Sequence, residues 1–332
     1  MLAAILLSCG IVCMSVIFIC QRWLFEKSPL TVKELLVCQH GISALVLTTA
    51  FVWWNEWGLH PQAQGQAQIY WLALGVETAI GVVIHYAVAK SYQLGEASLV
   101  TPIQAMTPGL ITATGLILGE FPSRNGLVGI FLIMLGTYVH GREDAESLAD
   151  YLRPFALLRL PRGFRFLPLA DRNIALKRRS AIRWAMVFAA AGTLALLCEG
   201  LVVRNGSVTL AYFLNQSALT LLFLFFLKKE PVQEERPYTL YHPKVRLLIM
   251  LLGLAYGLHI MFIVTSFRLT HVASVGTLKR FNIVLTGLMA WWILGEDKAK
   301  FRLIPAVVIT LGAILLGEDI GRMTESFYER FR

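Results

Sequence analysis

The chain has few charged residues for its length. Of its 332 residues, 15% are Asp, Glu, Lys or Arg, whereas soluble domains typically carry about 25%. Apolar residues make up 56% of the chain, and its mean hydropathy is +0.62. This composition argues against a water-soluble globular fold and predicts a protein that crosses a membrane several times.

The sequence also lacks the motifs of the common enzyme and metal-site classes. It contains no Walker loop, no dinucleotide-binding fingerprint, no zinc-ligand spacing and no nucleophile triad. Its five cysteines all lie within apolar runs, which excludes a disulfide scaffold and indicates small core residues. We therefore expect no enzymatic activity, no cofactor and no metal site.

Ten apolar runs, separated by charged residues or by clusters of Gly, Pro and Asn, approach the roughly 20 residues that a spanning helix needs. Apolar and polar residues do not alternate within them, so helices are expected rather than strands. The fold class predicted is an all-α polytopic membrane protein with ten transmembrane helices. The predicted spans are 2–21, 34–54, 69–90, 97–118, 124–140, 182–203, 208–227, 246–266, 273–294 and 303–317.

The net charge of +9 reflects an uneven distribution of basic residues between the loops. Of the 30 Lys and Arg, 22 follow odd-numbered spans, six lie in the other loops and the two ends, and two lie inside a span. The positive-inside rule predicts that both termini are outside the cytoplasm. We expect a multi-pass protein of the cell (inner or plasma) membrane, monomeric or homodimeric, that contacts lipids and a small-molecule substrate but no nucleic acid.

The largest break between spans is a basic segment, 142–181, which the charge rule places in the cytoplasm. Its middle alternates bulky apolar residues with Arg, so it could lie in an anionic headgroup layer or form a solvated linker. We therefore divide the chain into a first five-helix unit at 1–141, this linker, a second unit at 182–318 and a short tail at 319–332.

The two units resemble each other. A shift of 176 residues places 97–120 on 273–296 without a gap, and seven of these 24 positions are identical, including Leu-Gly-Glu at the end of both copies. The same shift matches Gln39-His40 with Asn215-Gln216, and a two-residue adjustment aligns Cys20-Gln21 with Cys198-Glu199. Because each unit holds five spans, an odd number, the copies are expected to form two inverted five-helix repeats.

A span that opens with Ala-Ser, contains a mid-helix proline (Pro108) and ends with Leu-Gly-Glu resembles the EamA-type repeat of the drug/metabolite transporter superfamily. The resemblance covers nearly the whole chain and is strongest in 90–140 and 266–317. It implies a ten-helix secondary transporter with a central cavity and fixes no substrate. Members of the family usually have cytoplasmic termini, so the charge count departs from the family's pattern here.

Lys279 and Arg280 are the sharpest candidates for a substrate site. They lie six or seven residues into the ninth predicted span, where an unpaired charge costs several kcal/mol unless it faces a cavity or a partner. The string Ser274-Val-Gly-Thr-Leu-Lys-Arg resembles the phosphate-binding helix of plastid phosphate translocators and nucleotide-sugar transporters, which implies an anionic ligand. The alternative is an ion pair with Glu77 that holds helices together.

Other polar residues within the spans are secondary candidates. Glu77 and His85 share one face of the third span, and Glu77 could couple proton entry to transport instead of forming that ion pair. Tyr256 and His259 are expected to line a cavity. Glu199 is expected near the membrane interface.

Three further assignments depend on position alone. Gln104 corresponds to Arg280 in the repeat and is expected to contact the substrate from across the cavity. Asn282, which follows the cation pair, is expected to contact the substrate as well. Pro102 and Pro108 interrupt the fourth span and are candidate gating kinks.

These features together predict a secondary active transporter that moves a small organic solute by alternating access, with an anionic or phosphorylated metabolite as the expected substrate. Two alternatives stay open. One is an exporter of neutral or cationic amphiphiles or amino acids, in which Glu77 neutralises the cations. The other is a flippase for a lipid-linked sugar, which would need a lateral opening between helices. A structural subunit would show no polar residues converging on a cavity.

Overall fold

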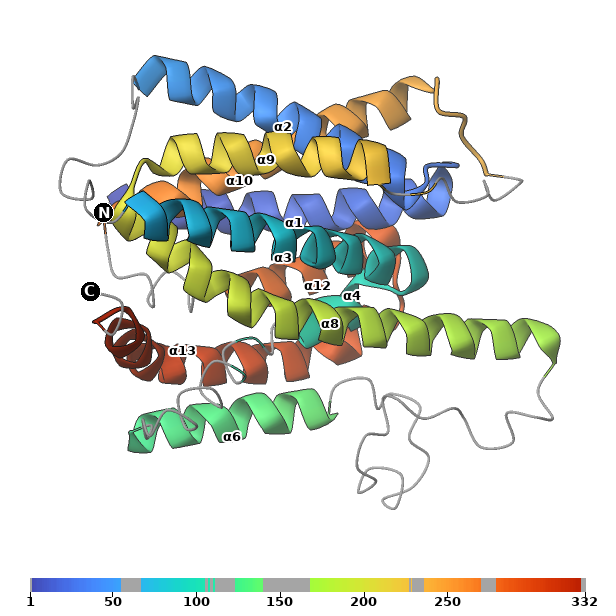
Figure 1. Cartoon of the computed structure of the whole chain (residues 1–332). Helices are drawn as coiled ribbons and strands as arrows, with labels where there is room; N and C mark the ends of the chain where they lie inside the picture. The colour runs from blue at the N-terminus through green and yellow to red at the C-terminus, as the bar shows by residue number, and fades with distance from the viewer. Residues whose placement is uncertain are drawn as a thin grey trace.

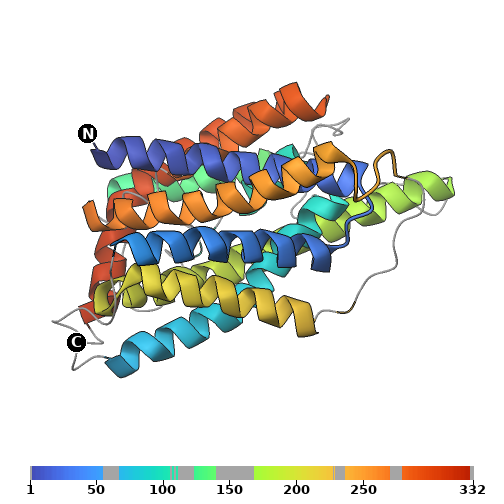
Figure 2. The ribbon, with the colours of Figure 1, turned by 90° about the horizontal axis from the view of Figure 1, so that it is seen from above.

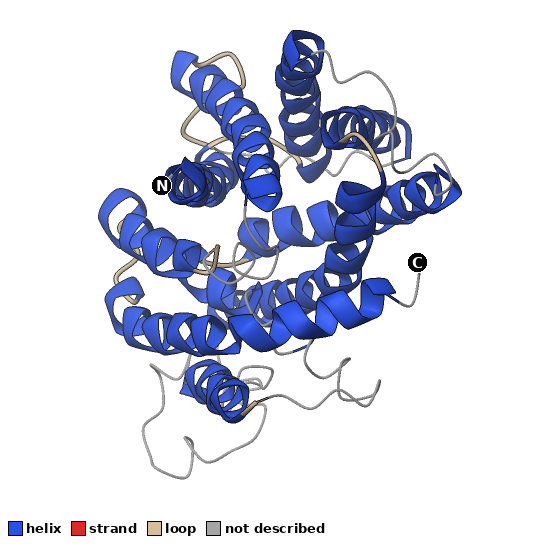
Figure 3. Cartoon of the chain, turned by 90° about the vertical axis from the view of Figure 1, so that its left-hand side faces the viewer, coloured by secondary structure: helices blue, strands red, loops and turns tan. Residues whose placement is uncertain are grey.

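The computed structural model describes residues 2–54, 67–104, 107, 110, 123–139, 168–226, 228, 236–269 and 279–329. All regular secondary structure within these residues is α-helical (Figure 3). The helices are α1 (Leu2–Lys27), α2 (Val32–Trp54), α3 (Ala67–Leu94), α4 (Ala97–Gln104), α6 (Arg124–Val139), α8 (Leu169–Asn205), α9 (Val208–Phe226), α10 (Pro243–Leu269), α12 (Phe281–Leu294) and α13 (Ala299–Glu329).

Six helices of the described residues are long and apolar enough to cross a membrane, and they lie within α1, α3, α8, α9, α10 and α13. Two shorter apolar helices, α6 and α12, accompany them. The prediction of an all-helical, membrane-embedded chain is therefore confirmed. The helices begin and end close to the predicted spans in most cases, because the charged and Gly/Pro-rich breaks coincide with the helix ends.

Helices that are distant in the sequence lie side by side. The bundle pairs α3 with α8, α1 with α10, and α2 with both α9 and α10 (Figure 2). At one edge of the molecule α6 packs along α13 (Figure 1). The helix α1 begins and α13 ends at the same end of the bundle (Figure 1). Most of these pairs join a helix of the first unit to a helix of the second.

Large apolar side chains lie on the outside of the bundle, and several polar side chains are buried within its mostly apolar core. Large apolar side chains on the outside are exposed, for example Phe226 at 79% and Trp292 at 84%. His40, Gln39 and Gln216 are buried between helices. A bilayer accepts apolar side chains and penalises polar ones, so this arrangement suits a membrane protein with a polar interior.

The helix α8 begins well before its predicted start. It opens at Leu169 rather than 182, so residues 169–181 of the predicted linker are helical, and the rest of the linker lies outside the described residues except for Pro168. With 37 residues, α8 is roughly 55 Å long, which exceeds the hydrocarbon core of a bilayer at about 30 Å. Its first turns, which carry Lys177, Arg178 and Arg179, project beyond the other helices (Figure 1).

The ninth predicted span is described from Lys279 onward. Lys279 and Arg280 lie in a turn, and α12 begins at the next residue, Phe281. The prediction that both cations lie inside a helix is therefore wrong: they precede its first turn. Residues 273–278 lie outside the described residues. In the fourth predicted span, α4 is described to Gln104 and includes Pro102, whereas Pro108 is outside the described residues.

Candidate functional site

A cavity of about 220 Å³ lies inside the bundle, bounded by α1, α2, α3, α8, α9, α10 and the turn before α12. Four of the residues that line it have acidic or basic side chains: Glu77, Glu199, Lys279 and Arg280. The polar neutral residues that line it are Gln21, Gln39, His85, Thr107, Tyr212, Asn215, Gln216, Tyr256 and His259. Two acids and two bases from distant parts of the chain therefore line one cavity.

The main chain of the two cations is anchored while their side chains have no acidic partner. The carbonyl oxygens of Lys279 and Arg280 accept hydrogen bonds from the first backbone amides of α12, at 3.2 and 3.0 Å. Within the described residues neither side chain forms an ion pair. The Nε of Arg280 is buried without a hydrogen-bond partner. The positive end of the α12 dipole lies beside them, so this side of the cavity favours an anion.

The two acids differ in their hydrogen bonding. Glu199 accepts a hydrogen bond of 2.9 Å from the hydroxyl of Tyr212, which lines the same cavity. Glu77 accepts none from the described residues, and no ion pair joins it to Lys279 or Arg280, unlike the arrangement offered as an alternative from the sequence.

Three aromatic rings form a cluster on the cavity wall. The rings of His40, His85 and Tyr256 lie edge to face, with centroid separations of 4.4, 5.3 and 5.6 Å. The hydroxyl of Tyr256 lies 3.3 Å from Nε2 of His85. These contacts hold α2, α3 and α10 together and orient Tyr256 and His85, both of which reach the cavity.

His259 is tied to α1 through one of its two ring nitrogens. Its Nδ1 donates to the carbonyl oxygen of Gly10 at 2.8 Å. Because a carbonyl only accepts, the proton is on Nδ1, and Nε2 of the neutral ring is left as an acceptor. His259 therefore has a structural hydrogen bond and also lines the cavity.

The structure brings together six of the residues predicted from the sequence and leaves others apart. Lys279, Arg280, Tyr256, His259, Glu77 and His85 all line the cavity. Gln104 does not: its amide accepts from Tyr92 and donates to Ser91. Asn282 is buried against α1, where its main-chain carbonyl oxygen accepts a hydrogen bond from the Ser15 hydroxyl. Pro102 is buried within α4. The expectation that Gln104 and Asn282 contact a ligand is therefore not met, because neither lines the cavity.

Sequence reasoning missed two important residues, Glu199 and its partner Tyr212. Glu199, which is expected near the membrane interface, lines the cavity from α8. A signal was present: the repeat aligns Glu199 with Gln21, and Gln21 lines the cavity as well. Two polar residues at matching positions of an apolar repeat indicate a shared interior face.

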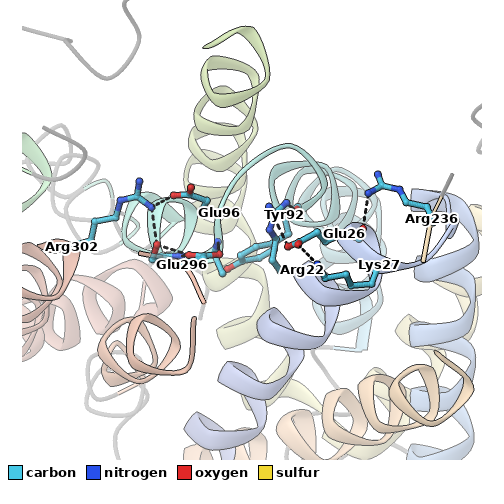
Figure 4. Close-up of polar contacts among 10 residues, drawn as sticks. Arg22, Glu26, Lys27, Tyr92, Glu96, Arg236, Glu296 and Arg302 are labelled. Carbon is cyan, nitrogen blue, oxygen red and sulfur yellow. Dashed lines mark hydrogen bonds and ion pairs between the residues drawn. The ribbon is translucent and has the colours of Figure 1, made fainter. Parts of the chain in front are cut away.

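A second polar cluster lies where α3 and α4 meet the turn between α12 and α13 (Figure 4). The carboxylate of Glu296 accepts hydrogen bonds from the backbone amides of Ala97 and Ser98, at 2.8 and 3.0 Å, and from the Ser98 hydroxyl at 2.6 Å. Arg302 pairs with Glu96 and donates to the Ser98 hydroxyl at 2.8 Å. Glu296 thus caps the start of α4.

The turn between α1 and α2 is held at the same end (Figure 4). The side chain of Arg236 donates to the main-chain carbonyl oxygen of Glu26 at 2.6 Å. The backbone amide of Tyr238 donates to the main-chain carbonyl oxygen of Lys27 at 3.1 Å. Trp23 stacks on Tyr238 with ring centroids 5.5 Å apart. Contacts between the first and second units therefore hold the helices together at this end of the bundle.

Among the described residues, no group of three or more His, Cys, Asp and Glu is placed to hold a metal ion. No known protein family matches this chain, and no curated protein matches its sequence.

Proposed function

We propose that this protein is a secondary active transporter of a small organic solute that carries an anionic group, and that it works by alternating access. The observation that carries the proposal is the pair Lys279 and Arg280, which line a cavity inside the bundle and form no ion pair with an acid among the described residues. A cation within a membrane costs several kcal/mol, so its presence calls for a function. An anionic solute would neutralise the pair when it binds.

The chemistry of the pair suits carboxylate or phosphate. The guanidinium of Arg280 offers a fork of donors that can bind two oxygens at once, and its buried Nε has no protein acceptor. Lys279 adds a compact charge, and the N-terminal end of α12 adds backbone dipoles. Broken helices whose N-termini point at an anion recur at the substrate sites of secondary transporters.

The packing between the two units supports alternating access in an inverted repeat. Under the 176-residue offset, the pairing of α1 with α10 corresponds to that of α8 with α3, and the pairs α2–α9 and α6–α13 correspond to themselves. The close contact of Gly129 with Gly312 corresponds in the same way to that of Pro305 with Gly136. Such a relation favours the EamA-type architecture of the drug/metabolite transporter superfamily and a site between the units.

One alternative, an exporter of cationic solutes, is favoured by the two carboxylates, Glu77 and Glu199, in the same cavity. The two functions differ in which charged residues the ligand needs. An anion requires Arg280, whereas a cation requires the acids and would be repelled by Lys279 and Arg280.

The test is uptake into proteoliposomes and binding to the purified protein, with organic phosphates, carboxylates and organic cations as solutes. We expect accumulation of at least one anionic solute. Arg280→Gln should weaken its binding roughly ten- to a hundred-fold, because one charge-assisted hydrogen bond is typically worth about 1.5–3 kcal/mol. Arg124→Gln, the same change at an exposed position at the start of α6, is the matched control. Equal binding by the wild type and Arg280→Gln would refute the anion site.

A further inference from the structure

The cavity is lined by two acidic and two basic side chains. Glu77 on α3 and Glu199 on α8 face the same space as Lys279 and Arg280, yet the described residues contain no ion pair among the four. An anion bound at Lys279 and Arg280 would neutralise the cations and leave both carboxylates in the membrane without a positive partner. That is costly, since unpaired carboxylates within a bilayer are penalised as cations are.

We propose that the substrate is a zwitterion, with an ammonium group that binds at Glu77 and Glu199 and a carboxylate or phosphate that binds at Lys279 and Arg280. This inference rests on the proposed function and narrows its substrate class. One small molecule with both groups would neutralise all four side chains at once. An anion alone or a cation alone would leave half of them uncompensated.

The acidic side of the cavity has the features of an ammonium site. Glu77 lines the cavity and accepts no hydrogen bond from the described residues, so its lone pairs are available to a ligand. Tyr212 donates to only one oxygen of Glu199, which orients the carboxylate and leaves the other oxygen for a donor. Tyr256 lines the same cavity, and an aromatic ring can attract an ammonium group.

The size of the cavity points to a small molecule. At about 220 Å³ it lies below the roughly 300–1,000 Å³ of pockets that hold drug-sized ligands. Apolar residues such as Met14, Ile17 and Phe188 also line it. A compact zwitterion with a short apolar or polar body, such as an α-amino acid or an amino-alkyl phosphate, meets these limits.

The experiment measures calorimetric binding of matched probes to the purified full chain in detergent. One set is leucine, 4-methylpentanoate and 3-methylbutylamine, which share a carbon skeleton and differ in charge. The other is O-phosphoethanolamine, ethyl phosphate and ethanolamine. We expect the zwitterion of one set to bind at least tenfold more tightly than either singly charged analogue. The set that binds identifies the anionic group as carboxylate or phosphate.

Variants assign each charge to its side of the cavity. Glu77→Gln and Glu199→Gln should each reduce zwitterion affinity at least tenfold while the anionic analogue binds as well as before or better. Glu26→Gln is the matched control, because Glu26 makes exposed ion pairs outside the cavity. Glu77→Asp keeps the charge and should retain part of the preference. Gel filtration of every variant separates a loss of binding from a loss of folding.

The outcomes separate this inference from the proposed function. If the anionic analogue binds as tightly as the zwitterion and Arg280→Gln weakens both, the acids serve another role, such as carrying a proton, and only the zwitterion inference is wrong. If the amine binds most tightly and Arg280→Gln has no effect, both proposals are wrong. The inference is also wrong if neither zwitterion binds at ten times the concentration at which any singly charged analogue saturates the protein.

Discussion

His40 on α2 donates a hydrogen bond from Nδ1 to Oε1 of Gln216 on α9, at 2.6 Å, and the two residues are 176 positions apart, the same offset that relates the repeats. This hydrogen bond is the first of a series in which each side chain donates to the next. Gln216 donates to the side-chain oxygen of Asn215 at 3.1 Å, and Asn215 donates to the hydroxyl of Thr78 at 3.0 Å. Thr78 in turn donates to the carbonyl oxygen of Leu74. In an inverted repeat, a residue that contacts its own equivalent lies close to the pseudo-two-fold axis.

Gln216→Leu should reduce the free energy of unfolding by about 1–3 kcal/mol, because it leaves the buried Nδ1–H of His40 and the oxygen of Asn215 without partners. His40→Leu should be comparably harmful. In the double variant His40→Leu/Gln216→Leu the combined loss should be smaller than the sum, since neither group then lacks its partner. Chemical unfolding of the four proteins in one detergent checks this, and strictly additive losses would mean that the bond contributes nothing.

The contact between α6 and α13 depends on two glycines. A methyl group added at Gly312 would lie 2.6 Å from the carbonyl oxygen of Gly129, and the reverse is equally close. Gly312→Ala should therefore force the helices apart and cost about 1–3 kcal/mol. Gly75→Ala in α3 is the control, because nothing lies within 4 Å of the added carbon. The control should be neutral or stabilising, since Ala favours helix more than Gly. Equal melting temperatures for both variants would contradict the close packing.

The helices and the charged residues of the cavity could be predicted because both follow from the free-energy cost of placing each residue in a membrane. A run of about 20 apolar residues has few alternatives to a spanning helix. A charge within such a run, as at Glu77 or Lys279, must face a cavity or a partner. The sequence therefore identifies candidates for the cavity without any knowledge of how the helices pack.

The errors came from details that depend on packing. Gln104 corresponds to Arg280 in the repeat, yet its amide is used by Tyr92 and Ser91. Sequence symmetry predicts equivalent backbone positions and not equivalent side-chain partners. Glu199 lies six residues from the end of α8, and distance from a helix end suggested the interface. Only the packing of α3 along α8 shows that this face of α8 turns inward.

The uneven distribution of basic residues predicts that the C-terminus is not cytoplasmic. The helix α13 ends where α1 begins, so both termini are expected on one side of the membrane (Figure 1). Loops at the opposite end carry most of the Lys and Arg, and such loops remain in the cytoplasm. A reporter that is active only in the cytoplasm should be inactive when fused after Arg332 and active when inserted into the basic segment 142–167. Reversed activities would show that the cytoplasmic termini usual in the drug/metabolite transporter superfamily apply here too.

The cap on α4 offers a test of the repeat itself. Glu296→Gln replaces a carboxylate that accepts from Ala97 and Ser98, so it should lower the free energy of unfolding by about 1–2 kcal/mol. Asp297→Asn is the control, because this neighbouring acid is exposed. It should change stability by less than about 0.5 kcal/mol.

The same change at Glu120 distinguishes a repeat from a chance resemblance. The 176-residue offset places Glu120 on Glu296, and Ala273-Ser274 on Ala97-Ser98, although Glu120, Ala273 and Ser274 lie outside the described residues. In an inverted repeat each Glu caps the span that opens with Ala-Ser in the other unit. Glu120→Gln should then destabilise the protein about as much as Glu296→Gln does. The two losses should add, because the sites do not share partners. If Glu120→Gln leaves the unfolding midpoint unchanged while Glu296→Gln lowers it, the two Leu-Gly-Glu sequences do not have equivalent roles.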